Sequence, residues 1–173
     1  MERTVFLVGF MGAGKTTLGK EAAKWMGWDF VDLDHFIEAE EGTTIRQIFE
    51  ANGESFFREI ERESLRKIAR SSGKNRIVAT GGGAPCYGDN MALINELGIS
   101  IYLKASVEML YNRLRLQKDE RPMIRAVADE NLPGFIQNLL EKREPFYQKA
   151  HFTLEFPHLT SRAMVHLIQE IQV

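Results

Sequence analysis

Short β-rich apolar runs alternate along the chain with longer segments whose apolar positions recur at helical spacing. This alternation is typical of a parallel sheet with helices on both faces. We predict strands at Thr4–Val8, Asp29–Leu33, Arg76–Thr80, Ser100–Leu103 and His151–Glu155. We predict helices at Lys15–Met26, Leu33–Glu41, Thr44–Asn52, Glu54–Ser71, Asp89–Leu97, Val107–Gln117, Leu132–Ala150 and Leu159–Gln172.

Two stretches depart from this simple alternation. Between the strand ending near Leu33 and the strand starting near Ile77 lie three helical segments instead of one, which indicates an inserted subdomain. Residues 116–122 are polar, densely charged and closed by a proline. That composition fits a flap that closes over a nucleotide, and it fits a solvated helix end equally well.

Length, charge and composition limit the class of protein. The chain has 173 residues and a net charge of −2, which favours a single domain and demands no nucleic-acid or membrane-surface partner. The single cysteine, Cys86, excludes an internal disulfide framework and fits a reducing compartment. No signal-peptide pattern is visible, and no apolar run approaches the roughly 20 residues that span a bilayer. We therefore expect a cytoplasmic protein and, because no heptad seam or long apolar edge is present, a monomer.

The most specific motif in the chain is a phosphate-binding loop. Residues 9–16, GFMGAGKT, match G-x-x-x-x-G-K-[ST] without a mismatch, between an apolar run and a helical pattern. Gly12 and Gly14 relieve side-chain crowding, so that successive backbone N–H groups can cradle the β- and γ-phosphates. Lys15 adds a mobile positive charge, and the Thr16 hydroxyl can ligate Mg²⁺. The sequence therefore predicts binding of a nucleoside triphosphate.

Two carboxylates, Asp32 and Asp34, flank Leu33 at the end of the second predicted strand. The carboxyl ends of parallel strands open onto the ligand crevice, so both carboxylates should lie near the phosphate loop. One can hold the Mg²⁺ shell while the other faces an acceptor, as phosphoryl transfer requires. The alternative is that Asp34 merely caps the helix that follows.

The inserted helices contain a candidate anion site. Arg58 and Glu61 are three residues apart and therefore share one helix face. The neighbouring Phe56 and Phe57 suggest that Arg58 is partly buried, where a guanidinium needs an anionic partner. The alternative is an intrahelical ion pair on a solvated surface.

Three consecutive glycines, Gly81, Gly82 and Gly83, close the third predicted strand. Glycines at a strand end let a ligand approach the backbone closely and expose N–H donors. Because this strand should neighbour the phosphate loop, a ligand contact is predicted here. The alternative is a wide turn without a ligand.

Two further arginines are candidates for contact with anionic ligands. Arg121 lies in the polar flap, from which it could reach the γ-phosphate and offset charge in the transition state. Arg143 lies in the helical pattern before the last strand, where Pro145 should kink or interrupt the helix and could aim Arg143 inward. We interpret Tyr147 and Phe146 as core residues. The four histidines show no metal-ligand spacing and are interpreted as structural or exposed.

Taken in order, these motifs resemble those of the shikimate kinase family. The matching segments are GFMGAGKTT, FVDLDHFIE, GTTIRQIFEANGESFFREIERESL, ATGGGAP, ERPMI and KREPFYQKA, from about Gly9 to Ala150. The resemblance implies an α/β P-loop NTPase fold of the nucleoside monophosphate kinase type, with a five-stranded parallel sheet in a single domain, 1–173. It also implies a substrate-binding subdomain at about 33–62 and a lid at about 114–128. The implied reaction moves the γ-phosphate of ATP to the 3-hydroxyl of shikimate, a step toward chorismate and aromatic amino acids.

The resemblance also implies roles for individual residues. Asp34 would bind the shikimate hydroxyls and act as, or orient, the base. The implied catalytic residues are Lys15, Asp34 and Arg121, with Arg121 as the lid arginine. Nucleotide binding would use Gly12, Ala13, Gly14, Lys15, Thr16, Thr17 and Arg121, with Mg²⁺ on Thr16 and Asp32 in its water shell. Substrate binding would use Asp34, Arg58, Glu61, Gly81, Gly82, Gly83 and Arg143, with Glu61 supporting Arg58.

The chain departs from the family pattern in small ways. Thr16 stands where the family often has serine, which keeps the hydroxyl, and the lid reads RPMI where RPLL is usual. The adenine contacts have no clear motif. Arg113, Arg115 or the loop around Phe156-Pro157 could supply them.

Three alternatives to this function can be compared with the sequence. A kinase of another small hydroxylated acid would share the pair Arg58 and Arg143, which predicts an anionic acceptor without naming it. A non-catalytic nucleotide-binding protein would be expected to have lost Lys15, Asp34 or Arg121, and all three are present. A GTPase-like switch would need an N-K-x-D motif, which the chain lacks.

Overall fold

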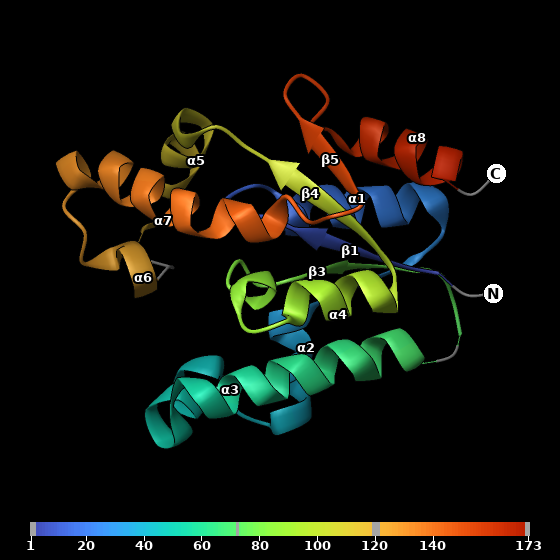
Figure 1. The fold of residues 1–173 in the computed structure, drawn as a ribbon, viewed down its shortest axis with the longest axis horizontal. Coiled ribbons are helices and arrows are strands. Elements are labelled where there is room, and N and C mark those ends of the chain that lie inside the picture. Colours follow the sequence, from blue (N-terminus) through green and yellow to red (C-terminus); the bar gives the residue numbers. More distant parts are fainter. Residues whose placement is uncertain (1–2, 72, 119–121, 172–173) are drawn as a thin grey trace.

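The computed structural model describes residues 3–71, 73–118 and 122–171. Within them, one sheet contains five strands in the order β2-β3-β1-β4-β5, and Figure 1 shows helices packed around it. All four strand pairs are parallel, which confirms the predicted parallel sheet. The strands are β1 (Thr4–Val8), β2 (Asp29–Asp32), β3 (Arg76–Ala79), β4 (Ile99–Lys104) and β5 (Phe152–Glu155).

The crossover connections place helices on both faces of the sheet. The unit β1–α1–β2, with α1 at Lys15–Met26, runs toward one edge of the sheet, and β3–α4–β4, with α4 at Asn90–Leu97, runs toward the other. Because such crossovers are right-handed, helices α1 and α4 cover opposite faces. Helix α8 (Ser161–Ile171) packs beside α1. The central strands β1 and β3 are buried along their whole length, as their continuous apolar runs predict.

The predicted insertion is helical and lies along the lower side of the molecule in Figure 1. Helices α2 (Leu33–Glu41) and α3 (Ile45–Arg70) pack against each other. Gly53 has φ 81° and ψ 177°, which breaks α3 into two parts that correspond to the two helices predicted there. Thr44 caps α3 by accepting a hydrogen bond from the backbone N–H of Gln47, and the Gln47 side chain accepts from the Thr44 backbone N–H.

Helices α5 (Val107–Leu114) and α7 (Leu132–Tyr147) pack against each other, and the remaining described helical segments are short turns. These turns are α6 (Pro122–Arg125), η1 (Ala84–Cys86) and η3 (Asp129–Asn131). The prediction that Pro145 interrupts its helix is wrong, because α7 continues through it to Tyr147. Pro145 has no backbone N–H to donate to the carbonyl of Glu141, yet the helix continues for two residues beyond it.

Other element boundaries shift by one to three residues from the predicted ones. Leu33 opens α2 instead of ending β2, and the helix predicted to reach Gln117 ends at Leu114. Such shifts are expected because helix ends depend on local capping and packing. No helix among the residues that the structure describes is both long and apolar enough to cross a membrane.

Candidate active site

The phosphate-binding loop joins β1 directly to α1 and forms the floor of the site. Gly14 occupies the N-cap position of α1 with φ 100°, a left-handed conformation that glycine adopts without strain. Among the described residues no side chain caps this helix end. The first backbone N–H groups of α1 have no acceptor within the helix, so they and the helix dipole favour an anion at this point.

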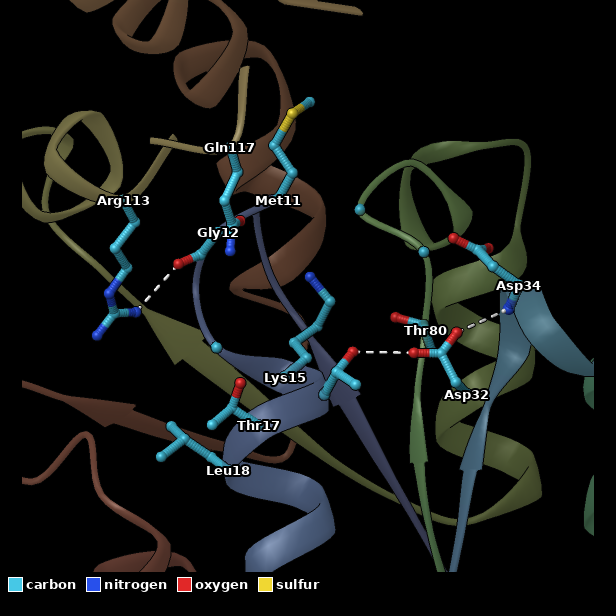
Figure 2. Close-up of a pocket in the computed structure, with 14 residues that line it drawn as sticks. Met11, Gly12, Lys15, Thr17, Leu18, Asp32, Asp34, Thr80, Arg113 and Gln117 are labelled. Carbon is cyan, nitrogen blue, oxygen red and sulfur yellow. Dashed lines mark hydrogen bonds between the residues drawn. The ribbon is translucent and has the colours of Figure 1, made fainter. Parts of the chain in front are cut away.

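Lys15 lies in the concavity of this loop, as Figure 2 shows, although its side chain is only 8% exposed. Its Nζ donates to the backbone carbonyl of Gly9 at 2.7 Å and to that of Phe10 at 2.9 Å. The loop carbonyls thus hold the ammonium group over the same pocket in which the helix N-terminus opens. The arrangement places one positive charge where phosphate oxygens would bind.

Thr16 and Asp32 bring two oxygen-bearing side chains together in the same pocket. The Thr16 hydroxyl donates to Asp32 Oδ2 at 2.9 Å (Figure 2). Asp32 is also the N-cap of α2, where Oδ1 accepts from the backbone N–H of Asp34 at 3.2 Å. The capping role considered for Asp34 therefore belongs to Asp32, which leaves the Asp34 carboxylate available to the pocket.

Asp34 stands at the border between the nucleotide pocket and the glycine segment. Its side chain stays open to solvent on the pocket side, but the protein around it excludes enough water to raise its pKa, and the negative charge of Asp32 raises the pKa further. The positive charge of Lys15 acts in the opposite direction. A carboxylate with a raised pKa beside a phosphate cradle is suited to accept a hydrogen bond or a proton from an acceptor hydroxyl.

A pocket of about 370 Å³ brings most of the predicted nucleotide residues together (Figure 2). Of the predicted set, it is lined by Gly12, Gly14, Lys15, Thr16, Thr17, Asp32, Asp34, Gly81 and Gly82. Ala13 is buried, and its N–H donates to the Phe10 carbonyl within the loop at 3.2 Å. The pocket lining also includes Met11, Leu18, Thr80, Arg113 and Gln117.

Arg113 has a role that sequence analysis did not identify. Its Nη1 donates to the backbone carbonyls of Gly12 at 3.0 Å and of Ala13 at 3.1 Å. It therefore anchors the phosphate loop from α5, whereas the sequence suggested only a contact with adenine. The residues are about a hundred positions apart in the chain, and no motif links them.

The segment Gly81–Gly83 lies against the predicted acceptor residues. A Cβ atom placed on Gly81 would lie 3.1 Å from Asp34 Oδ1, and one on Gly83 would lie 2.9 Å from Arg58 Nη2. A Cβ atom on Gly82 would lie 3.1 Å from the backbone nitrogen of Met11, which belongs to the phosphate loop. Side chains at these positions would therefore collide with the site. The three glycines bring a backbone surface into contact with it.

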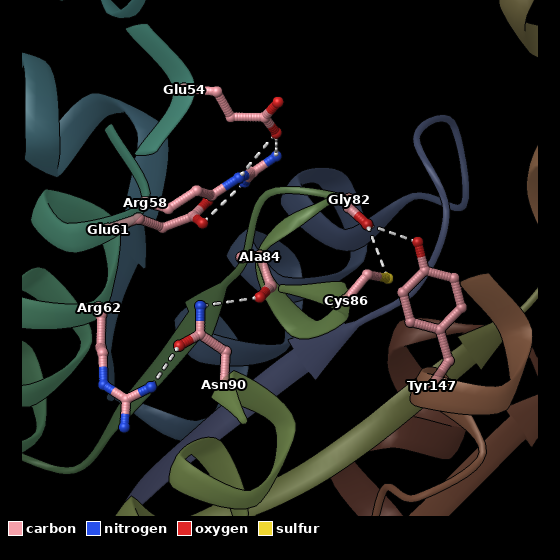
Figure 3. Close-up of polar contacts among 9 residues, drawn as sticks. All are labelled: Glu54, Arg58, Glu61, Arg62, Gly82, Ala84, Cys86, Asn90 and Tyr147. Carbon is pink, nitrogen blue, oxygen red and sulfur yellow. Dashed lines mark hydrogen bonds and ion pairs between the residues drawn. The ribbon is translucent and has the colours of Figure 1, made fainter. Parts of the chain in front are cut away.

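Arg58 and Glu61 form a largely buried ion pair. Arg58 Nη1 donates to Glu61 Oε2 at 2.8 Å, and the two side chains are 13% and 1% exposed. Burial raises the pKa of Glu61 to about 7, against the lowering effect of Arg58. The Nε and Nη2 atoms of Arg58 donate to Glu54, whose side chain is 61% exposed. Arg58 is thus held in place on α3 and is not the solvated surface ion pair of the alternative interpretation (Figure 3).

Arg143 reaches the glycine segment from α7. A Cβ atom on Gly82 would lie 3.5 Å from Arg143 Nη1, and the guanidinium carbon lies 5.8 Å from the centroid of the Phe10 ring. Gly83 and the side chains of Arg58, Glu61 and Arg143 do not line the nucleotide pocket itself. The three side chains lie close to the glycine segment at the border of the pocket. Two guanidinium groups on either side of exposed backbone can bind one small carboxylate.

Arg121, predicted as the lid arginine, lies outside the described residues. Within the described part of the chain, no cluster of three or more His, Cys, Asp or Glu side chains could hold a metal ion alone. The pair Thr16–Asp32 fits a cation with a different coordination, because Mg²⁺ takes few protein ligands and completes its shell with water and substrate phosphates.

Comparisons with known proteins agree on one family. A family model described as shikimate kinase matches residues 11–172. A shikimate kinase of Parabacteroides distasonis is 48% identical over 164 residues, covering 95% of this chain and 94% of the relative. The crystal structure of shikimate kinase from Bacteroides thetaiotaomicron has a TM-score of 0.86 at 38% identity over 98% of both chains. Shikimate kinase from Acinetobacter baumannii in complex with shikimate has a TM-score of 0.82 at 36% identity, covering 99% of this chain and 93% of that one.

Proposed function

We propose that this chain, which belongs to the shikimate kinase family, transfers the γ-phosphate of ATP to the 3-hydroxyl of shikimate. Membership of the family makes it an ATP-dependent phosphotransferase. The observation that carries the proposal is the position of Gly81–Gly83. A Cβ atom added at one end of this segment would meet Asp34, one added at its middle would meet the phosphate loop, and one added at its other end would meet Arg58.

On the nucleotide side, the loop N–H groups and Lys15 would hold the β- and γ-phosphates. Thr16 and Asp32 would hold Mg²⁺ together with those phosphates and water, and the bound ion would supply positive charge against the transferring group. Lys15 would act on the same phosphate oxygens without moving far, because loop carbonyls already hold its ammonium group. Positioning and charge, with little covalent work by the protein, would account for the rate.

On the acceptor side, Arg58 and Arg143 would pair with the carboxylate of shikimate, with Gly82 between them. Glu61 would keep the Arg58 guanidinium oriented. This pairing would place a hydroxyl of the acceptor near Asp34, which would accept its hydrogen bond or proton as the oxygen attacks phosphorus. The raised pKa of Asp34 makes it a better proton acceptor than an ordinary aspartate.

The domain layout belongs to the same proposal. Residues 33–62 would form the substrate-binding subdomain and residues 114–128 the lid, within one kinase domain. Arg121 would enter the site from the lid when the lid closes. We further propose that the protein acts as a cytoplasmic monomer on small molecules, without a nucleic-acid or membrane partner.

The first experiment is a coupled assay of ADP release with ATP and Mg²⁺. Shikimate, quinate, gluconate and no acceptor are compared in parallel. Release that depends strictly on shikimate is expected. ATP binding without shikimate-dependent release would refute the proposed acceptor, and a stronger response to gluconate would favour a kinase of another hydroxylated acid.

The acceptor site is tested with Arg58→Gln. Loss of a charge-assisted hydrogen bond to the carboxylate is expected to raise the KM for shikimate by about tenfold or more, with little change in the KM for ATP. Arg46→Gln is the matched control, because Arg46 forms an exposed pair with Glu50 on the first part of the same helix. An unchanged KM for shikimate in Arg58→Gln would contradict the carboxylate assignment.

A further inference from the structure

Tyr147 connects the end of α7 to the glycine segment. Its side chain is fully buried, and its ring packs against Tyr102 with centroids 5.3 Å apart. The sequence predicts a core residue at this position, and the packing agrees. Its hydroxyl, however, donates to the backbone carbonyl of Gly82 at 2.5 Å (Figure 3). The core residue therefore also contacts the backbone of the site.

We propose that Tyr147 is a positioning residue for the acceptor: its hydroxyl holds the Gly82–Gly83 peptide so that the Gly83 N–H faces the acceptor site. This inference rests on the proposed function. It concerns a residue that touches neither the acceptor nor the nucleotide and acts through the backbone of Gly82.

The geometry of the Gly82–Gly83 peptide bond fixes the direction in which the Gly83 N–H points. The only cis peptide bond among the described residues is Phe156-Pro157, so the Gly82–Gly83 bond is trans. In a trans peptide the C=O of one residue and the N–H of the next point in opposite directions within one rigid plane. The Gly82 carbonyl points to Tyr147 on α7, so the Gly83 N–H points away from α7. Figure 3 shows Arg58 on that opposite side.

A glycine segment needs such an external constraint. Three glycines in succession have no side chains to restrict backbone rotation, so the peptide orientation must be set by neighbouring groups. Next along the chain, Asn90 is fully buried and its Nδ2 donates to the carbonyl of Ala84 at 3.0 Å. Cys86 adds a weak S–H contact to the Gly82 carbonyl at 3.9 Å. Tyr147 is the strongest of these donors at the centre of the segment.

The hydroxyl of Tyr147 is a constant donor. Burial raises its pKa well above the ordinary value for tyrosine, so the proton stays on the oxygen at any pH at which the enzyme would work. The hydrogen bond from the Tyr147 hydroxyl to the Gly82 carbonyl is therefore not lost as the pH rises. Its effect on acceptor binding should be the same across the neutral range.

The experiment compares Tyr147→Phe with Tyr102→Phe. Each change removes one hydroxyl from the same pair of packed rings, but the Tyr102 hydroxyl donates to Glu144 at 3.4 Å and not to the glycine segment. Tyr147→Phe is expected to raise the KM for shikimate and its Kd in calorimetry by about three- to tenfold, as the loss of one hydrogen bond implies. The KM for ATP should stay within about twofold of wild type, and Tyr102→Phe should change neither constant.

A purely structural role would give a different result. Tyr147→Phe would then lower the melting temperature without raising the KM for shikimate more than the KM for ATP. Alternatively, Tyr147→Phe and Tyr102→Phe would have the same kinetic constants. Either outcome overturns the proposal. If Tyr147→Phe does not fold, the wild-type protein is tested by the amide resonance of Gly83. A shift on adding shikimate, absent with ADP alone, supports the proposal, and no shift overturns it.

The wild-type assay separates this inference from the proposed function. Wild-type protein without shikimate-dependent ADP release refutes the function. Wild-type turnover with an unaltered shikimate KM in Tyr147→Phe refutes only the positioning role.

Discussion

Replacing Glu61 with glutamine should make the free energy of unfolding less dependent on pH. Glu61 is 1% exposed and pairs with Arg58, and burial raises its pKa from 4.5 to about 7. Between these two pH values the unfolded chain has released the Glu61 proton while the folded chain retains it. Raising the pH through this window therefore destabilises the folded state.

The size of the effect follows from the difference between the two pKa values. At about 1.4 kcal/mol per pKa unit, the ionised carboxylate costs the folded state roughly 3 kcal/mol at most above pH 7. Glutamine has the shape of the protonated side chain and does not titrate. The variant should therefore gain stability relative to wild type as the pH rises from about 5 to 8, by an amount approaching that figure. The neighbouring charges that set this balance are Arg58, Asp34 and Glu54.

Urea unfolding at pH 5, 6, 7 and 8, followed by tryptophan fluorescence, measures the difference. Glu63→Gln is the control, because Glu63 lies on the same helix in a pair with Arg66 and its side chain is 62% exposed. Its difference from wild type should not vary over this range. A constant difference for Glu61→Gln would mean that Glu61 is ionised throughout. A variant that loses stability relative to wild type as the pH rises would mean that the Arg58 charge outweighs burial. Either result refutes the reasoning.

Two further predictions concern turnover. Gly83→Ala places a methyl group 2.9 Å from Arg58 Nη2, so the guanidinium must shift. Steady-state kinetics should then show a raised KM for shikimate and little change in the KM for ATP. Wild-type values of both constants would contradict the close contact. Asp34→Asn removes the proton acceptor and should lower kcat by about a hundredfold or more with a modest change in ATP affinity. Full activity in Asp34→Asn, measured by ADP release, would remove Asp34 from the mechanism.

Local features of the fold were predictable from the sequence. The strand, glycine loop and helix around Lys15 are contiguous, so their spacing specifies the phosphate cradle without help from distant residues. The strands β1, β3 and β4 were also predictable, because buried parallel strands require mostly apolar runs. Element ends were less predictable, as the wrong interpretation of Pro145 shows. A proline can remain inside a helix where tertiary packing offsets its missing backbone hydrogen bond, and the sequence does not show that packing.

The arrangement of the acceptor-binding residues could not be predicted from the sequence, because it depends on the tertiary structure. The sequence by itself identified Arg58, Gly83 and Arg143 as candidates, but only the packing of α3, the β3 loop and α7 places them around one backbone segment. The contact of Tyr147 with Gly82 spans 65 positions in the chain, and no periodic pattern encodes it. The altered pKa of Glu61 likewise arises from the protein that surrounds it. Sequence determines which chemical groups are present and the local turns that present them, whereas desolvation and long-range hydrogen bonds exist only once distant elements have packed together.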